Sequence, residues 1–159
     1  MKTETEKILS LLKRTFERGA WHGPSVKEAL KDVDRELALK RIGNTHSIIE
    51  LVAHMTSWRL YVINRLQGNN SYVVSDSMNF PKRDDWQNVL AELDNSQQQL
   101  LALIETFPVY KLSELVPVSE QNYTYNTLLN GIIHHDVYHA GQIMLIRRAM
   151  EVGSLEAAG

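Results

Sequence analysis

Apolar residues recur at α-helical spacing in four long segments of the chain, and this periodicity restricts the fold more than any other feature. The segments run from 3 to 16, from 44 or 45 to about 66, from 84 or 85 to about 106, and from 124 to about 153. Each places a stripe of aliphatic and aromatic residues on one side of a helix. No segment shows the strict alternation of a half-buried strand. The sequence therefore predicts an all-α fold, a four-helix bundle.

Capping and turn residues define the ends of these helices. Ser25 and Glu28 have the spacing of a capping box, which predicts a short extra helix between the first two long ones. Residues 67–83 are rich in Asn, Ser and Gly and form the longest connection, so we expect them to cross the bundle. The later long helices are expected to start at Asn44 or Thr45, at Asp84 or Asp85, and at Thr124.

Length and composition narrow the class of protein. A chain of 159 residues with 43% hydrophobic content suits one domain, 1–159, with a single core. The 17 basic and 19 acidic residues form no basic cluster, so nucleic acid is not an expected partner. The charged N-terminus does not resemble a secretory signal, and no apolar run has the length of a membrane span. We expect a cytoplasmic protein with no membrane partner.

Three of the six histidines are candidate metal ligands. His135 and His139 are four residues apart, which turns a helix by about 400° and places both imidazoles on one face. His54 lies in the middle of an apolar helix, where an unpaired imidazole is costly and where it could meet the other two. The chain has no cysteine, so histidine and carboxylate side chains must carry any metal chemistry. The spacing alone leaves a second interpretation open, in which these are hydrogen-bonded core histidines.

Two known metal motifs share part of this pattern. The sequence His135-Asp136-x-x-His139 is close to the H-E-x-x-H helix of metalloproteases, but Asp is one methylene shorter than Glu and no strand is available to bind a peptide. The doublet His135-Asp136 also resembles that of HD-type phosphohydrolases, which need a further Asp ligand downstream. No Asp follows Asp136, so neither motif is favoured.

Three blocks, taken together, resemble the DinB/YfiT-like superfamily of metalloenzymes. They are Trp-His-Gly-Pro-Ser at 21–25, His-Ser-Ile-Ile-Glu-Leu-Val-Ala-His-x-x-x-Trp at 46–58, and Gly-Ile-Ile-His-His-Asp-x-Tyr-His-Ala-Gly-Gln-Ile at 131–143. The blocks occur in order over almost the whole chain. The resemblance implies an up-down-down-up connection of the four helices and a triple-histidine site at His54, His135 and His139.

The resemblance also implies a cofactor, a reaction class and partners. Nickel or zinc is the expected ion, with manganese and iron as further candidates, and a homodimer is expected. Characterised relatives include S-transferases and isomerases that use low-molecular-weight thiols. We therefore expect a metal-dependent S-transferase or hydrolase that acts on a small molecule, with a low-molecular-weight thiol as a candidate partner. The alternative is a non-catalytic metal-binding or interaction bundle.

Other residues near the candidate ligands have two interpretations each. Glu50 is four residues before His54 and is a candidate general base or a carboxylate that orients a metal-binding histidine, although a solvated helix Glu has the same pattern. Gln142 is three residues after His139 and is a candidate for orienting a ligand or substrate, although Gly141 and Gln142 also suit close helix packing. His134 points about 100° away from His135 and is assigned to another surface. The remaining histidines, His22 and His46, are assigned to caps or hydrogen bonds near the bundle end. The aromatic residues Trp21, Trp58 and Tyr138 are assigned to the core, and a place at the border of the pocket is the alternative for Tyr138.

Overall fold

The computed structural model describes residues 2–119 and 122–156. Within these residues the chain forms helices and no strand, and the only β-type contact is an isolated bridge between Leu115 and Thr124. The all-α prediction is confirmed. The helices are α1 (Glu4–Phe16), α2 (Val26–Leu30), α3 (Arg35–Leu39), α4 (Ile48–Leu66), α5 (Asp76–Asn79), α6 (Trp86–Glu105), the 3₁₀ helix η1 (Val109–Ser113) and α7 (Tyr125–Glu156).

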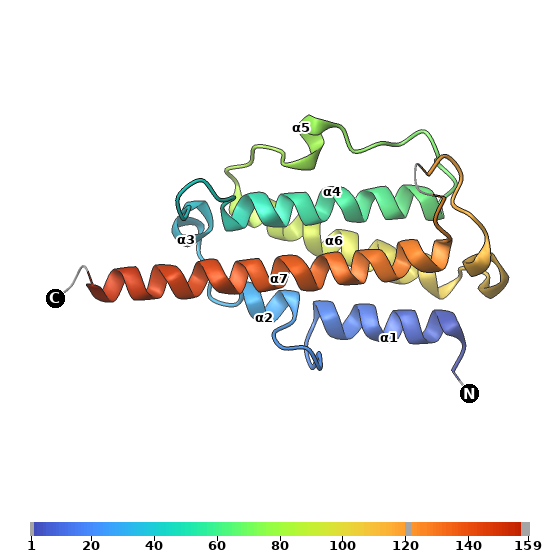
Figure 1. The fold of residues 1–159 in the computed structure, drawn as a ribbon, viewed down its shortest axis with the longest axis horizontal. Coiled ribbons are helices and arrows are strands. Elements are labelled where there is room, and N and C mark those ends of the chain that lie inside the picture. Colours follow the sequence, from blue (N-terminus) through green and yellow to red (C-terminus); the bar gives the residue numbers. More distant parts are fainter. Residues whose placement is uncertain (1, 120–121, 157–159) are drawn as a thin grey trace.

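The four long helices lie alongside one another (Figure 1). In the view of Figure 1, α4 and α6 run from left to right, whereas α1 and α7 run from right to left. Helix α4 contacts both α6 and α7, and α1 contacts the same two helices. The connection that contains α5 returns along the outside of α4 and contacts it. These contacts bring the middle of α4 beside the middle of α7.

Two separate hydrophobic clusters make up the core. One joins the first halves of α4 and α6 to α2 and to the second half of α7, and the other joins α1 to the remaining halves of α4, α6 and α7. Buried polar residues lie between the two clusters along the bundle. We call them the polar layer: His54, Arg59, Gln97, Asp136 and His139. Because buried polar groups are costly unless they are paired, each member needs a partner or a function.

The predicted helix starts are partly correct. Asp85 caps α6, and Thr124 caps α7 by accepting a hydrogen bond from the backbone of Thr127. The start of α4 at Asn44 or Thr45 is wrong, because Ser47 and Glu50 form a capping box that begins the helix at Ile48. Helix α7 also continues past Gly153 to Glu156, since one glycine lowers helix stability by only about 1 kcal/mol.

The predicted short helix is confirmed, but a second one follows it. Ser25 and Glu28 form the expected capping box at the start of α2. The chain then turns at Asp32, which has a φ of 61°, and Asp34 caps α3. A helix of five residues carries too little periodicity to be recognised from sequence.

Several apolar side chains that the pattern assigns to the core are exposed. Trp21 is 100% exposed in the turn between α1 and α2, and Tyr138 is 63% exposed on α7. Leu11 and Leu145 also lie on the solvent side of their helices. The prediction of Trp21 and Tyr138 as core residues is wrong, whereas Trp58 is partly buried.

Among the described residues, no helix combines the length and the apolar character that crossing a bilayer requires.

Candidate metal centre

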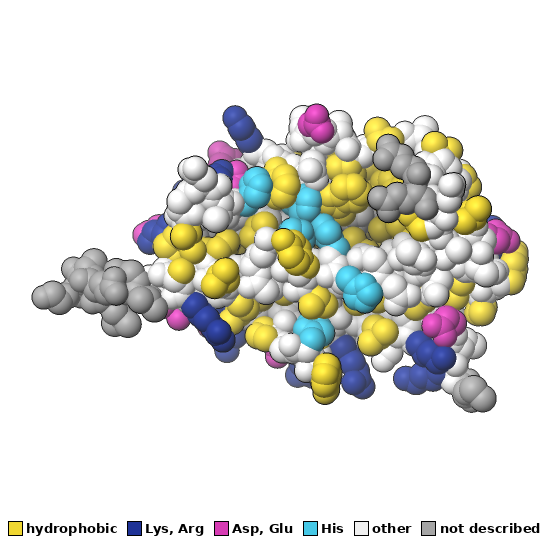
Figure 2. Space-filling view, viewed as in Figure 1, with side chains coloured by type: hydrophobic (Ala, Val, Ile, Leu, Met, Phe, Trp, Pro, Cys, Tyr) yellow, Lys and Arg dark blue, Asp and Glu magenta, His cyan; other side chains and the backbone are white. Residues whose placement is uncertain are grey.

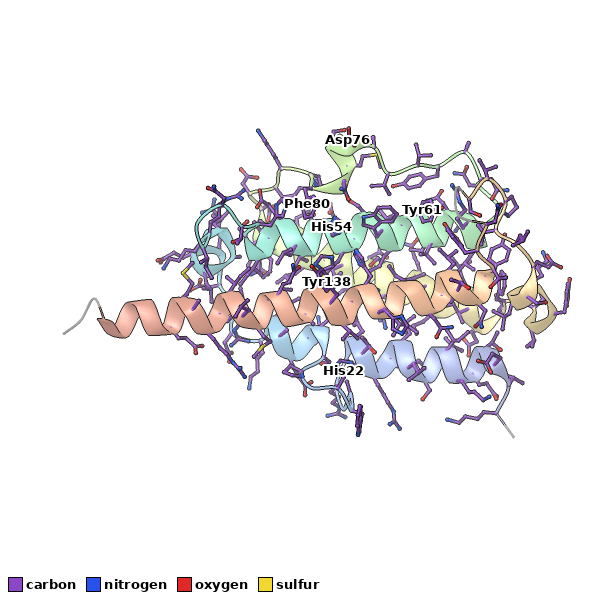
Figure 3. All side chains as sticks on the ribbon, viewed as in Figure 1. His22, His54, Tyr61, Asp76, Phe80 and Tyr138 are labelled. Atoms are coloured by element: carbon purple, nitrogen blue, oxygen red, sulfur yellow. The ribbon has the colours of Figure 1, made fainter. Side chains whose placement is uncertain are left out.

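The imidazoles of His54, His135 and His139 meet between α4 and α7. His135 Nε2 is 3.1 Å from His54 Nε2 and 3.2 Å from His139 Nε2. One nitrogen from each ring lies within 4.8 Å of the others. Helical spacing places His135 and His139 on one face of α7, and the packing of α4 against α7 brings His54 to them (Figure 3). We call these three residues the histidine triad.

Hydrogen bonds from the opposite ring nitrogens set the tautomers of two members. His54 Nδ1 donates to the backbone oxygen of Asn79 at 2.7 Å, and His139 Nδ1 donates to Gln142 Oε1 at 2.6 Å. With the proton on Nδ1, the Nε2 atom of each ring carries a free lone pair. Among the described residues, His135 Nδ1 is buried without a partner. The prediction that Gln142 orients a member of the site agrees with this contact.

Burial keeps all three rings neutral at neutral pH. Loss of solvation lowers the pKa of His135 to about 3, with a further contribution from the neighbouring His139. Loss of solvation also lowers the pKa of His139 to about 4 and lowers that of His54. Neutral imidazole is the form that binds a metal ion, so the triad can bind one without a nearby base to remove a proton first.

The donor set fits a divalent transition metal. Nitrogens bound to zinc at about 2.0–2.1 Å in a tetrahedral shell lie about 3.3 Å apart, close to the two contacts of His135. A single proton on His135 Nε2 could be donated to one of these two partners, but the lone pair of the other partner would then have no hydrogen atom to accept. A shared ion satisfies all three lone pairs. The triad is therefore compatible with metal binding, and imidazole suits zinc, nickel, copper and iron alike.

Residues of the connection between α4 and α6 complete one side of the triad. Phe80 stacks on His54 with ring centroids 4.1 Å apart and on His46 with centroids 3.7 Å apart. Asn79 accepts from His54 through its backbone and from Trp58 Nε1 through its side chain, the latter at 2.9 Å. Asn79 and Phe80 were not predicted as part of the site, because nothing in the sequence of a polar connection indicates which of its residues contacts the bundle. Phe80 is the one phenylalanine in that connection, and its large apolar side chain was the feature of the sequence that could have indicated a contact with the bundle.

Asp136 follows His135 in sequence but faces a different part of the bundle. It forms an ion pair with Arg59 in which both side chains are 0% exposed. Arg59 Nη1 donates to Gln97 Oε1 at 2.8 Å, and the guanidinium lies over the Phe16 ring at 4.6 Å. A carboxylate bound in this way does not serve as the base of an H-E-x-x-H type site. Arg59 could not be predicted as its partner from the sequence, because the pairing joins two different helices.

Glu50 is held at the start of α4. Its Oε2 accepts from the backbone of Ser47 at 2.9 Å, and its Oε1 pairs with Arg41. Burial alone raises the pKa of Glu50, but the hydrogen bonds from Ser47 and the charge of Arg41 outweigh this and lower it. These contacts support a capping role for Glu50. Its predicted catalytic role stays a prediction.

The remaining histidines lie outside the triad. His134 is exposed on α7, as its position on the helix predicts. His46 stacks on Phe80 and lies 3.6 Å from Glu50, so it borders the triad rather than capping a helix. His22 is exposed in the turn after α1, well away from His54 in the view of Figure 3.

An apolar cavity of about 250 Å³ opens beside the triad at His135. Residues of α4, α7 and the preceding loop line it: Trp58, Tyr61, Val62, Tyr123, Thr127, Leu128, Gly131, Ile132 and His135. Figure 2 shows the same juxtaposition, with histidine side chains gathered on this face beside hydrophobic ones. A molecule in this cavity would contact a triad member directly.

The fold and the triad define a class of protein, an all-helical protein with a histidine cluster that is compatible with metal binding. The family profile of the DinB superfamily matches residues 20–143, and the chain belongs to this superfamily. The matched range contains the whole triad and the segment that covers it. The resemblance noted from the sequence is thus confirmed. No match was found among curated proteins or among solved structures.

Proposed function

We propose that the chain is a metal-dependent enzyme that holds one divalent transition-metal ion at His54, His135 and His139 and acts on a small molecule. The observation that supports this most directly is the contact of three neutral Nε2 atoms, two of which have their tautomer fixed by a hydrogen bond at Nδ1. Hydrogen bonds of this kind orient metal-bound histidines in general. Nickel and zinc are the first candidates for the ion.

The proposed reaction is S-transfer or hydrolysis. His54, His135 and His139 would hold the ion as neutral imidazoles, so the ion would keep its full positive charge and would favour the deprotonated form of a thiol or of water. The chain contains no cysteine, so a thiol would come from a small molecule. His54 and His139 are oriented by Asn79 and Gln142, and the apolar cavity beside His135 would bind the substrate and exclude water from it.

Three further features belong to the proposal. The directions of the four long helices in Figure 1 support the up-down-down-up bundle of the family. A homodimer and a cytoplasmic location are expected from the resemblance alone. The protein's molecular mass in solution would test the homodimer.

Metal content measured by mass spectrometry tests the site. Wild-type protein without a histidine tag, incubated with zinc, nickel or manganese and then desalted, should retain about one ion per chain. His139→Ala should lose the ion. His134→Ala is the matched control, because it removes an exposed imidazole from the same helix, and it should retain the ion. Absence of any ion from wild type would overturn the proposal.

Activity assays test the catalytic part. Thiol-transfer and hydrolysis substrates would be screened with the metal-loaded protein, and any activity should disappear when a chelator removes the ion. The helical circular dichroism should persist after chelation. If activity is absent from every class of substrate while the ion is bound tightly, a structural role for the ion is favoured instead.

A further inference from the structure

A second buried arginine lies near the other end of α4. Arg65 is 2% exposed, yet among the described residues no carboxylate lies within 4.0 Å of its guanidinium. Its Nη1 donates to the backbone oxygen of Asn69 at 2.9 Å, and its Nε is buried without a partner. The guanidinium lies over the Tyr61 ring at 4.5 Å.

These contacts compensate only part of the charge. Arg59, the other buried arginine of α4, has a carboxylate and an amide oxygen as partners. Arg65 has one carbonyl, one aromatic face and the C-terminal end of α4. The helix end and the ring each attract a cation weakly, whereas a buried charge without a counter-ion is strongly disfavoured. Within the described part of the chain, Arg65 therefore has no anionic partner.

Arg65 lines a cavity that could receive that anion. The cavity has a volume of about 370 Å³, and among the residues that the structure describes Arg65 is the one charged residue that lines it. The other lining residues are aromatic or aliphatic: Trp58, Tyr61, Val73, Val74, Val118 and Tyr123. An apolar wall around one guanidinium suits a ligand with an apolar body and a single negative charge.

Arg65 and His54, the triad member on α4, are on the same face of that helix. His54, Trp58, Tyr61 and Arg65 follow one another at spacings of four, three and four residues, which keeps them on one side of the helix. Arg65 is then about 16 Å along the helix from His54. Figure 3 shows Tyr61 lying beyond His54 in this direction.

Aromatic residues separate the two cavities. Trp58, Tyr61 and Tyr123 line both the cavity beside His135 and the cavity at Arg65. The Tyr61 and Tyr123 hydroxyl groups are hydrogen-bonded at 2.6 Å. A ligand bound at Arg65 would therefore pack against the same rings that form the wall of the cavity beside the triad.

We propose that Arg65 binds the carboxylate of a small organic monoanion whose apolar part lies against Trp58 and Tyr61. The planar guanidinium matches a carboxylate, and one positive charge balances one negative charge, which favours a carboxylate over a phosphate dianion. The site itself does not require the metal. Its role, to anchor the end of a substrate that is remote from the reacting group, rests on the proposed function.

Nuclear magnetic resonance of the tryptophan indole groups tests the binding site directly. The probe is 4-phenylbutyrate, compared with its neutral amide and with 4-phenylbutylamine, on wild-type protein. The Trp58 indole signal should move with the carboxylate. The Trp86 indole, which is buried and bonded to the backbone of Val33, serves as an internal reference and should not move. Equal shifts with all three compounds would overturn the proposal.

Variants then assign the effect to Arg65. Arg65→Met should weaken 4-phenylbutyrate binding at least about tenfold, since it removes a charge-assisted hydrogen bond. Arg83→Met changes the net charge equally at an exposed site and should bind as wild type does. Arg65→Lys keeps the charge without the planar fork and should be intermediate. Unchanged affinity of folded Arg65→Met for 4-phenylbutyrate would overturn the proposal. If Arg65→Met does not fold, unchanged affinity of Arg65→Lys together with equal binding of the neutral amide would overturn it.

The outcome is separable from that of the metal site. His139→Ala lacks a triad member but leaves the Arg65 cavity intact, so 4-phenylbutyrate should still bind to it. Binding by this variant, together with its loss of the ion, supports both proposals. Loss of binding in His139→Ala while its helices persist would contradict an anion site independent of the metal.

Discussion

Arg59 and Asp136 form an ion pair with no access to solvent, and its effect on stability depends on both partners being present. Each side chain is 0% exposed. Removal of one partner leaves the other charge buried and uncompensated, which typically costs about 3–5 kcal/mol. We expect Asp136→Asn to lower the free energy of unfolding by about this amount, measured by denaturant titration.

The double variant Arg59→Met/Asp136→Asn should recover much of that loss, because no uncompensated charge remains. Glu4→Gln is a control, since it breaks the exposed pair with Lys7 and should change stability by less than about 1 kcal/mol. A loss in Asp136→Asn no larger than in Glu4→Gln would show that the buried pair contributes little.

The triad should make the metal-free protein sensitive to acid. His135 and His139 have a pKa of about 3 and about 4 in the folded protein. Their unfolded value is about 6.5. A lowered folded pKa means that the unfolded chain binds protons first, so the stability is present above pH 6.5 and is lost as the pH falls towards 4.

From pH 7 to pH 5, each of these two histidines should lower the free energy of unfolding by up to about 2 kcal/mol. Denaturant titrations of chelator-treated protein at both values measure this. His139→Gln should show a smaller decrease over the same interval, because it lacks one titrating ring. An equal decrease in the variant would mean that other groups dominate the pH dependence.

Local spacing made the pair of His135 and His139 predictable, and the apolar surroundings of His54 together with the family resemblance added the third residue. Other tertiary contacts could not be predicted from the sequence. The four-residue step from His135 to His139 is a property of one helix, and it survives in the structure. The pairing of Asp136 with Arg59 and of His54 with Asn79 joins residues 77 and 25 positions apart. Such contacts depend on how helices and connections pack, which periodicity does not specify.

At the scale of elements, the connection around α5 is part of the site. None of the four residues of α5 is buried, so its position depends on the contacts of Asn79 and Phe80 with α4. Phe80→Ala removes the ring stacked on His54. We expect faster amide hydrogen exchange in 75–82 and weaker metal binding, because the segment that orients His54 is less firmly held.

The global free energy of unfolding should fall by only about 1–2 kcal/mol in Phe80→Ala, since the ring is partly exposed and its stacking is a modest contribution. Val73→Ala removes an apolar side chain from the same connection and is the control, because Val73 is 64% exposed. If exchange in 75–82 is unchanged in Phe80→Ala, Phe80 does not anchor the segment.

The four long helices were predictable from apolar periodicity because each has a continuous buried stripe. The end of α4 agrees with the prediction. Its start does not, because the capping box of Ser47 and Glu50 begins the helix after the predicted Asn44 or Thr45. Helix α3 was missed because five residues make little more than one turn. Periodicity also does not predict the exposure of Leu11 and Leu145, because an apolar residue beside the buried stripe of its helix can still face solvent.

At the scale of the whole molecule, the polar layer divides the core. A hydrophobic cluster lies on each side of it, and the triad joins α4 to α7 between them. Since each cluster packs its helices without help from the triad, the fold should persist when an ion is removed. An ion bound only by the folded state should nevertheless stabilise it.

This arrangement predicts a measurable difference between removing the ion and unfolding the protein. At an ion concentration 100 times its dissociation constant, the gain is about 2.7 kcal/mol, which for a chain of this size raises Tm by about 5–10 °C. Thermal unfolding of chelated wild type with and without added zinc measures the shift, and His54→Ala should show none. The far-ultraviolet circular dichroism of wild type at 25 °C should be the same in both states, because the two clusters hold the helices. Loss of the helical signal on chelation would instead identify the ion as a structural requirement. It would also show that the two hydrophobic clusters alone do not hold the helices together.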